Sequence, residues 1–360
     1  MRQKAILVGT VLDRGSVFEE EESLKELGRL ADTAGASVID HVVQRRVRPD
    51  AAYFIGKGKV EELALAVRDS RADLVIFDHS LTPSQASKIQ GILECRVVDR
   101  AELIMHIFAL HAKTAEAKIQ VELAQLQYRF SRLVGAGLEM TDPGAGIGTR
   151  GPGEKQLELD RRKIRQRISR LKGELKKVEQ QRKVQRKSRQ GIFQIALVGY
   201  TNAGKSTLMN LLSKARVKVE DRLFATLDAT TRAVVLASGE KFLLTDTVGF
   251  IRRLPHLLVA SFKATLEEVT QADLVLHVVD TPHPLYQKEI SAVEEVLKEI
   301  KADRPELIVF NKIDQLSPET INELRRNHPG AALISAMTGD GRRDLEDIIR
   351  QKMESFTGRE

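Results

Sequence analysis

The sequence predicts an α/β protein built in three parts, and three observations support this prediction. Short apolar runs alternate with amphipathic helical stretches over residues 1–112, and the same alternation returns over residues 191–360. Residues 113–190, which lie between them, have the apolar spacing of two long helices. Because alternating strands and helices form parallel sheets covered by helices, we expect a small parallel α/β domain, a long antiparallel helical pair and a second α/β domain.

The composition excludes several classes of protein. With 42% apolar and 30% charged residues, the 360-residue chain has the make-up of a soluble globular protein. Its apolar runs are as short as strands, which argues against a membrane span. Cys95 is the only cysteine, which excludes internal disulfides and a cysteine-rich metal site. We therefore expect a cytoplasmic monomer that associates with membranes loosely at most.

The N-terminal domain is predicted from four strand-like runs, "KAILVGTVL", "SVIDHVV", "DLVIFDH" and "RVVDR". Helical stretches lie between them, around residues 21–34, 59–69 and 83–93. The run "GKGK" at residues 56–59 is too short for a phosphate-binding loop, and the histidines lack the spacing of metal ligands. The sequence assigns no chemistry to this domain.

The middle part is predicted to be a helical hairpin. Apolar residues step by four and three positions over residues 119–133, and a similar stripe runs over residues 157–178. Two such stripes joined by one loop are typical of an antiparallel helical pair. A glycine-rich run at about residues 135–153 forms the loop at its tip.

The net charge of +7 is unevenly distributed. Residues 161–189 contain 14 basic and two acidic residues, a net charge of +12, so the rest of the chain has a net charge of −5. A merely solvated helix face usually mixes both signs, whereas a concentrated basic element is typical of nucleic-acid binding. The candidate RNA-binding residues are Arg150, Lys155, Arg161, Arg162 and Arg165.

The glycine-rich run "GAGIGTRGPGEKQLELDRR" at residues 144–162 does not fit a second nucleotide site. A dinucleotide fingerprint needs a preceding strand, whereas a helix precedes this run, and Pro152 interrupts it. Glycines allow the backbone to approach closely, and arginines contact phosphates or stack on unpaired bases. We expect a tip that inserts into a narrow crevice in RNA; a simple helix connector is the alternative.

The strongest chemical signal lies in the last domain, whose strands are expected near 192–199, 233–237, 241–246, 273–280, 306–311 and 331–334. The run "GYTNAGKST" follows the first of these strands and matches the phosphate-binding P-loop pattern. Its backbone N–H groups are expected to surround phosphates, with Lys205 at the β- and γ-phosphates and Ser206 on Mg²⁺. The predicted phosphate-binding residues are Gly199, Tyr200, Thr201, Asn202, Ala203, Gly204, Lys205, Ser206 and Thr207.

Two further motifs predict guanine as the base. In "NKID", the carboxylate of Asp314 can accept hydrogen bonds from the N1–H and N2–H₂ edge of guanine, and adenine offers no such pair. The later run "SAMTG" is expected to close over the base. The predicted base-binding residues are Asn311, Lys312, Asp314, Ser335, Ala336 and Met337.

Two switch segments complete the predicted GTP site. In "DTVG", Asp246 is expected to hold Mg²⁺ through water, and the N–H of Gly249 to contact the γ-phosphate. In "LFATLDATTR", Thr226 is the expected second Mg²⁺ ligand, with Thr230 and Thr231 as rivals. The catalytic candidates are Lys205, Thr226 and Gly249, and the other predicted contacts are Phe224, Ala225, Leu227, Asp228, Thr247 and Val248.

Phe250 follows Gly249, where many GTPases have a glutamine that orients the attacking water. A phenyl ring forms no such hydrogen bond, so we expect slow hydrolysis that a partner stimulates. Asn202 is a candidate for coordinating K⁺ near the phosphates, with a loop-stabilising role as the alternative.

The ordered motifs resemble the HflX family of translational GTPases, within the Obg-related group. "FATLDATTR", "DTVGF", "NKID" and "SAMTG" carry the resemblance, together with "GIGTRGPGEKQLELDRR" and the N-terminal "YFIGKGKVEEL". It implies a Mg²⁺-dependent GTPase that binds the large (50S) ribosomal subunit and its RNA, and splits or rescues ribosomes under stress. Many members carry a further C-terminal domain, which this sequence is expected to lack. The alternatives are a regulatory GTPase acting on a protein effector and an RNA-remodelling NTPase.

Overall fold

The computed structural model describes residues 2–13, 15–139, 152–187, 191–213, 223–224, 227–253 and 263–357. Their contacts form two compact units. The first contains Met1–Leu110 with Lys118–Lys177, and the second contains His111–Ala117 with Val178–Glu360. The predicted domain boundaries at 112 and 190 stay predictions. No helix in the described part of the chain has the length and apolar character that a membrane crossing requires.

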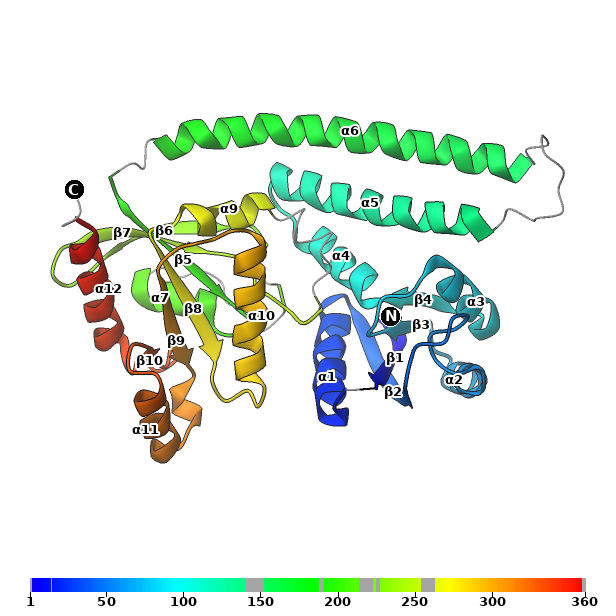
Figure 1. Ribbon diagram of the computed structural model, residues 1–360, viewed down its shortest axis with the longest axis horizontal. Coiled ribbons are helices and arrows are strands. Elements are labelled where there is room, and N and C mark those ends of the chain that lie inside the picture. The colour runs from blue at the N-terminus through cyan, green and yellow to red at the C-terminus, as the bar shows by residue number, and fades with distance from the viewer. Residues whose placement is uncertain are drawn as a thin grey trace. The chain divides into compact units, whose positions relative to one another are not determined.

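A four-stranded parallel sheet forms the centre of the first unit (Figure 1). The strands lie in the order β2-β1-β3-β4. Their bounds are β1 (Gln3–Leu12), β2 (Ala36–Arg46), β3 (Leu74–Phe77) and β4 (Arg96–Asp99). The helices that alternate with them are α1 (Val17–Thr33), α2 (Lys57–Ser70), α3 (Pro83–Leu93) and α4 (Arg100–His111). Helix α4 was not among the predicted helices, although "AELIMHIFAL" is apolar enough for a buried helix.

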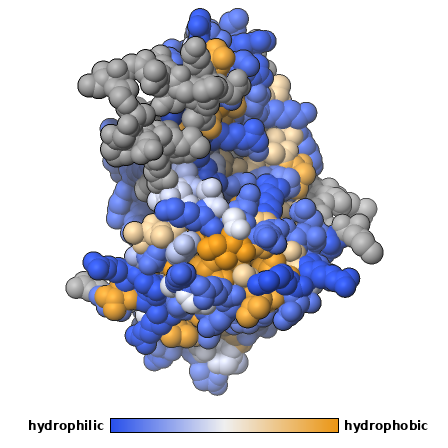
Figure 2. All heavy atoms as spheres, turned by 90° about the vertical axis from the view of Figure 1, so that its right-hand side faces the viewer, coloured by the Kyte–Doolittle hydropathy of each residue, from blue (hydrophilic) through white to orange (hydrophobic). Residues whose placement is uncertain are grey.

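The core of this unit contains both apolar and charged side chains. Ile6, Val75 and Ile89 are fully buried in an apolar cluster that residues of α2 and α3 share with the sheet. Arg100, at the start of α4, is 1% exposed and pairs with Glu26 and with Asp78. A buried cation needs such partners because its desolvation is costly. Outside the core, the face seen in Figure 2 is mostly hydrophilic around an apolar patch.

The predicted helical pair consists of α5 (Ala115–Glu139) and α6 (Pro152–Lys187), which run side by side in Figure 1. Three arginines of α6 reach α5. Arg161 donates to the carbonyl oxygen of Leu133 at 2.7 Å, and the guanidinium of Arg165 lies 5.1 Å from the ring centre of Phe130. Arg167 forms two hydrogen bonds with the carboxylate of Glu122, at 2.7 and 2.8 Å. The helix contact therefore contains ionic and cation–π interactions as well as the apolar stripe.

The second unit contains a six-stranded sheet in the order β10-β9-β8-β5-β7-β6, and only β6 is antiparallel to its neighbour. The strands are β5 (Phe193–Gly199), β6 (Thr230–Val235), β7 (Lys241–Asp246), β8 (Leu274–Asp280), β9 (Glu306–Asn311) and β10 (Ala332–Leu333). The helices are α7 (Lys205–Ser213), α9 (Lys263–Gln271), α10 (Tyr286–Glu299), the 3₁₀ turn η1 (Ile313–Gln315), α11 (Pro318–Asn327) and α12 (Arg342–Thr357). The predicted α/β fold class is confirmed.

The parallel strands of this sheet bring the sequence motifs to one edge. Gly199 ends β5, Asp246 ends β7 and Asn311 ends β9. Because carboxyl ends of parallel strands meet at the same edge of a sheet, these residues face the crevice where ligands bind in open α/β sheets. β6 begins at Thr230, three residues earlier than expected, because its pairing with β7 starts at Thr230 and Asp246.

Candidate nucleotide-binding site

The P-loop turns sharply between β5 and α7, and two glycines make this turn possible. Gly199 has a φ of 145°, and a Cβ there would lie 2.1 Å from the carbonyl oxygen of Val278. Gly204 has a φ of 94°, and a Cβ there would lie 2.2 Å from Nδ2 of Asn311. A side chain at position 199 would require the backbone of β8 to move, and one at position 204 would displace the side-chain amide of Asn311. The loop therefore ends at the N-terminus of α7, where backbone N–H groups favour anions.

Lys205 is the first residue of α7, and it is buried. Its Nζ donates to the carbonyl oxygens of Gly199 at 3.0 Å and Tyr200 at 2.7 Å, which places it across the mouth of the loop. Burial lowers the pKa of Lys205 to about 8, and the negative charge of Asp246 partly opposes this effect. The group therefore gains much from a nearby phosphate, which would favour its charged form.

Ser206 and Asp246 lie in contact. The hydroxyl of Ser206 donates to Oδ2 of Asp246 at 2.6 Å, which joins the start of α7 to the end of β7. Hydroxyl and carboxylate oxygens are ligands that Mg²⁺ accepts. Two of the three residues predicted to hold Mg²⁺, Ser206 and Asp246, therefore lie together, and the third, Thr226, lies outside the described residues.

The segment after β7 is fastened to the P-loop by its backbone. Phe250 N–H donates to the Gly199 carbonyl at 3.1 Å, and Thr201 N–H donates to the Phe250 carbonyl at 2.7 Å. A Cβ on Gly249 would lie 2.8 Å from Cγ2 of Thr201 and 2.9 Å from Nζ of Lys205. Glycine is thus required for this close approach. The side chain of Phe250 is 2% exposed, so it packs in the core and presents no polar group to a nucleotide.

Asn311 connects two parts of the site. Its side-chain N–H₂ donates to the Ala203 carbonyl at 2.7 Å, and its side-chain oxygen accepts from the Ala336 N–H at 2.9 Å. The P-loop and the "SAMTG" segment are therefore held by one buried amide. Neighbouring Lys312 has a φ of 63° and pairs with Asp280 at 2.6 Å. Asp280 was not among the predicted site residues, although a carboxylate at the end of the adjacent strand β8 was a signal for it.

The predicted base-binding residues include an exposed carboxylate. Asp314 lies in η1, is exposed, and makes no hydrogen bond to the residues that the structure describes. Ser335 is fully buried, and its hydroxyl accepts from the Thr338 N–H at 3.1 Å. Met337 is 85% exposed beside them. This arrangement leaves the Asp314 oxygens available to a ligand, which is the property that guanine recognition needs.

Only part of the first switch segment lies in the described residues. Phe224 and Leu227 are buried, whereas Ala225 and Thr226 lie outside the described residues. Thr230 and Thr231 are the first residues of β6, and the hydroxyls of Thr231 and Thr245 lie 3.0 Å apart. The two rival threonines are therefore held in the sheet.

Other predicted site residues have different surroundings. Asp228 accepts hydrogen bonds from the start of the helical pair, through Lys113 and Thr114. Thr247 is fully buried and donates to the Leu197 carbonyl, Val248 is buried, and Thr207 lies in α7. Asn202 is exposed with a φ of 63°.

The predicted RNA-binding residues divide into three groups. Arg162 is exposed, Arg165 is exposed but lies over Phe130, and Arg161 is half-buried and bonded to α5. Lys155 lies in α6, and its side chain lies outside what the structure describes, as does Arg150 entirely. Sequence position alone did not separate the outward side of the basic helix from its packed side.

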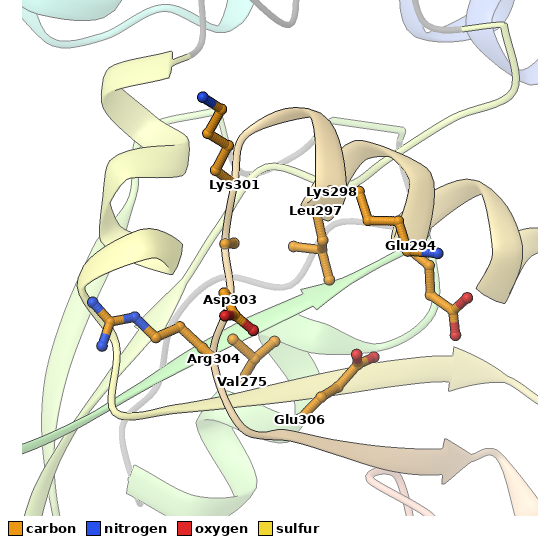
Figure 3. Close-up of a pocket in the computed structure, with 9 residues that line it drawn as sticks. Val275, Glu294, Leu297, Lys298, Lys301, Asp303, Arg304 and Glu306 are labelled. Atoms are coloured by element: carbon orange, nitrogen blue, oxygen red, sulfur yellow. The ribbon is translucent and has the colours of Figure 1, made fainter.

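One cavity in the second unit does not have the properties of a phosphate site. It has a volume of 590 Å³ and lies at the amino-terminal ends of β8 and β9, away from the P-loop (Figure 3). Three acidic and three basic residues line it, namely Glu294, Asp303, Glu306, Lys298, Lys301 and Arg304. Their charges balance, so the cavity offers no excess of positive charge to a nucleotide.

Three family models match consecutive parts of the chain. The one described as "GTP-binding GTPase N-terminal" matches residues 21–109 and the one described as "GTP-binding GTPase Middle Region" matches residues 111–189. The third, "50S ribosome-binding GTPase", matches residues 194–312. Together they cover most of the chain.

Similar proteins and structures agree with these matches. GTPase HflX of Caldanaerobacter subterraneus subsp. tengcongensis is 51% identical over 318 residues, which are 88% of this chain and 73% of that protein. GTPase HflX of Escherichia coli is 45% identical over 340 residues, 93% of this chain and 80% of that protein. A GTP-binding protein of Sulfolobus solfataricus in complex with GDP has 25% identity and a TM-score of 0.51, covering 98% and 99% of the two chains. The chain belongs to the HflX family of GTPases, and it is a P-loop enzyme that binds and hydrolyses GTP.

Proposed function

We propose that this GTPase binds the large ribosomal subunit through its RNA in the GTP state and splits or rescues ribosomes under stress. The observation that carries the proposal is the basic surface of α6, which belongs to a chain whose GTPase domain matches a family described as ribosome-binding. Membership of the GTPase family leaves open which partner the protein binds and what GTP hydrolysis achieves.

The nucleotide site has proposed roles for its main residues. Lys205 contacts the β- and γ-phosphates, Asp314 reads guanine, and the Gly249 N–H contacts the γ-phosphate. Ser206 and Thr226 bind Mg²⁺, which Asp246 holds through water. The bound ion would neutralise developing charge on the phosphates. The positions of Thr230 and Thr231 in β6 support Thr226 as the switch residue. Asn202 is proposed to help coordinate K⁺.

The side of α6 that carries the proposal differs from its packed side. Arg167 is paired with Glu122, and Arg165 lies over Phe130. Among the α6 side chains that the structure describes, the exposed cations with neither a contact to α5 nor an ion pair are Arg162, Lys163, Lys172, Lys176 and Lys177, whereas exposed Arg170 pairs with Glu174. A row of unneutralised cations along one helix can follow a phosphate backbone, and its binding releases counterions. These residues are therefore the proposed RNA contacts of the helix, together with Lys155 near its start and the tip-loop residue Arg150.

Binding and hydrolysis are linked through the nucleotide state. A ligand shifts an equilibrium only by its difference in affinity for the two states. The GTP form is therefore proposed to bind the separated large subunit tightly, and hydrolysis to release it. The buried side chain of Phe250 fits this order of events because this residue itself offers no group to orient water. Ribosome binding would supply or order that group.

The test is sedimentation of the protein with purified 50S subunits in the presence of a non-hydrolysable GTP analogue. Arg162→Glu with Lys163→Glu should weaken binding at least tenfold, because about two phosphate contacts are lost. The control, Lys88→Glu with Lys298→Glu, makes the same charge change at exposed sites away from α6. Equal binding by both variants would contradict RNA docking through this face and favour a protein effector.

A further inference from the structure

We propose that a cavity in the first unit is a binding site for a phosphate group. The cavity has a volume of 270 Å³ and lies among the start of β4, one side of α4 and one side of α5. The side chains that matter here are Arg96, Glu102, His106, Tyr128, Arg129 and Arg132. None of them belongs to the predicted GTP site.

The cavity has an excess of positive charge. Three guanidiniums line it, and Glu102 is the single carboxylate among its lining residues. Arg96 and Arg132 share that carboxylate, at 3.1 and 2.9 Å. Arg129 is exposed and has no carboxylate partner among the residues that the structure describes. The lining therefore has three cations against one anion, and Arg129 is the cation that a bound anion would pair with.

The guanidinium of Arg132 is held in place before any ligand arrives. It lies 5.1 Å from the ring centre of Tyr128, and its Nη1 is bonded to Glu102. Tyr128 is itself fixed, because its hydroxyl donates to Oδ2 of Asp99 at 2.7 Å. Burial raises the pKa of Tyr128, and the nearby charge of Asp99 adds to this effect, so the phenol stays neutral. A stacked, planar donor loses little freedom when it binds an oxyanion.

The charge of Asp99 does not cancel the excess at the cavity. Its carboxylate is fully buried and already accepts hydrogen bonds from the Leu81 N–H, the Glu102 N–H and the Tyr128 hydroxyl. It is therefore occupied within the fold and turned to other partners. The open side of the cavity is lined by Arg96, Arg129 and His106, which are all exposed.

Phosphate is the anion that this arrangement fits. Guanidinium groups bind phosphate oxygens in paired hydrogen bonds. The guanidinium donors of this cavity come from β4, through Arg96, and from α5, through Arg129 and Arg132. A tetrahedral group with several oxygens can meet donors from several directions, whereas a carboxylate presents two oxygens in one plane. The volume suits a phosphate with a small attached group, because cavities for larger ligands usually exceed about 300 Å³.

The phosphate can come from two sources, an RNA backbone or a free phosphorylated molecule. Only the RNA source has a connection with the proposed ribosome function. The chemistry of the site does not depend on that proposal, because inorganic phosphate tests it without ribosomes. Failure of ribosome binding and failure of this site are therefore separate results.

The experiment uses the full chain loaded with GDP and Mg²⁺, so that the P-loop does not bind the added phosphate. Arginine side-chain Nε–H resonances are followed by ¹⁵N NMR while inorganic phosphate, or a short oligouridylate, is added. Arg129→Gln and Arg132→Gln assign the two resonances. Arg129→Gln should weaken phosphate binding by about tenfold, the effect of one lost charge-assisted contact. Lys118→Gln is the control, an exposed cation on α5 outside the cavity.

Each outcome has a defined meaning. Shifts of the Arg129 and Arg132 resonances with both titrants support the site and include RNA among its sources. Shifts with phosphate alone support a small phosphorylated ligand, and shifts with the oligonucleotide alone support an RNA backbone phosphate. No shift with either titrant, or equal weakening by Lys118→Gln and Arg129→Gln, would overturn the proposal.

Discussion

The hydroxyl of Thr114 donates a 2.5 Å hydrogen bond to the carboxylate of Asp228, although the two residues are 114 positions apart in sequence. The other oxygen of Asp228 accepts from the backbone N–H groups of Lys113 and Thr114. Thr114 in turn accepts from the Ala117 N–H in the first turn of α5. Asp228, in the segment before β6, therefore fixes the start of α5. Asp228 is two residues after the proposed switch residue Thr226 in the sequence.

The first prediction concerns the stability of this contact. Thr114→Val removes both the helix cap and the donor to Asp228, and we expect it to lower the free energy of unfolding by about 1–2 kcal/mol. Asp228→Asn should have an effect of similar size. Because the two side chains share one hydrogen bond, the double variant should lose less than the sum, by about 0.5 kcal/mol or more. Urea unfolding of the four proteins measures this.

The same variants test the sequence-based prediction that Asp228 contacts the nucleotide. If Asp228 contacts GTP, Asp228→Asn will weaken nucleotide binding and Thr114→Val will leave it unchanged. If Asp228 acts through Thr114, the two variants will change GTP affinity alike. Additive losses of stability, with an effect on GTP for Asp228→Asn alone, would contradict the structural role.

The second prediction follows from the lowered pKa of Lys205. In the free enzyme this group loses its charge above about pH 8, while bound phosphates raise the pKa and restore the proton. Binding of GDP at pH 9 should therefore take up roughly one proton, and affinity should fall as pH rises through that range. At pH 6.5 Lys205 is charged in both the free and the GDP-bound enzyme, so binding should take up no proton.

Calorimetry in two buffers of different ionisation enthalpy measures this proton uptake. Lys205→Arg is the matched control, because arginine stays charged in both states. Proton uptake of equal size in the wild type and in Lys205→Arg at pH 9 would show that another group is responsible.

The third prediction concerns Gly249. An alanine methyl there would meet the P-loop at Thr201 and the end of Lys205. We expect Gly249→Ala to reduce the rate of GTP hydrolysis about a hundredfold, a loss typical of displaced charge-stabilising groups. Gly330→Ala is the control, because a Cβ at Gly330 has no atom within 4 Å. Single-turnover hydrolysis compares the two, and wild-type rates for Gly249→Ala would refute the requirement for close approach.

The fourth prediction concerns the base. Asp314→Asn replaces an acceptor by a donor at the exposed position in η1, and a buried mismatch costs about 1–3 kcal/mol for each polar group. We expect GTP affinity to fall by a factor of about 100, and affinity for xanthosine triphosphate to rise, because its C2 oxygen accepts from the new amide. Competition binding with the two nucleotides measures the change. An unaltered preference for GTP would remove Asp314 from base recognition.

The local motifs were predictable because their chemistry depends on short spacings. The P-loop glycines, Lys205 and Ser206 lie within one turn, and the strands that end in Asp246 and Asn311 follow from apolar runs. Contacts between distant residues left no such pattern. Nothing near Asp228 indicates Thr114, and the charge of Arg165 is the same whether it faces RNA or packs on Phe130. The start of β6 was also missed, because its pairing with β7 decides it.

The most direct test of the ribosome proposal is GTP hydrolysis with and without purified 50S subunits, at low and moderate salt. The account predicts slow hydrolysis by the protein alone, because Phe250 is buried and offers no water-orienting group. It predicts a large stimulation by 50S subunits that fades as salt rises, since phosphate contacts weaken steeply with ionic strength. Equal rates with and without subunits at low salt would contradict the account and move the partner away from the ribosome.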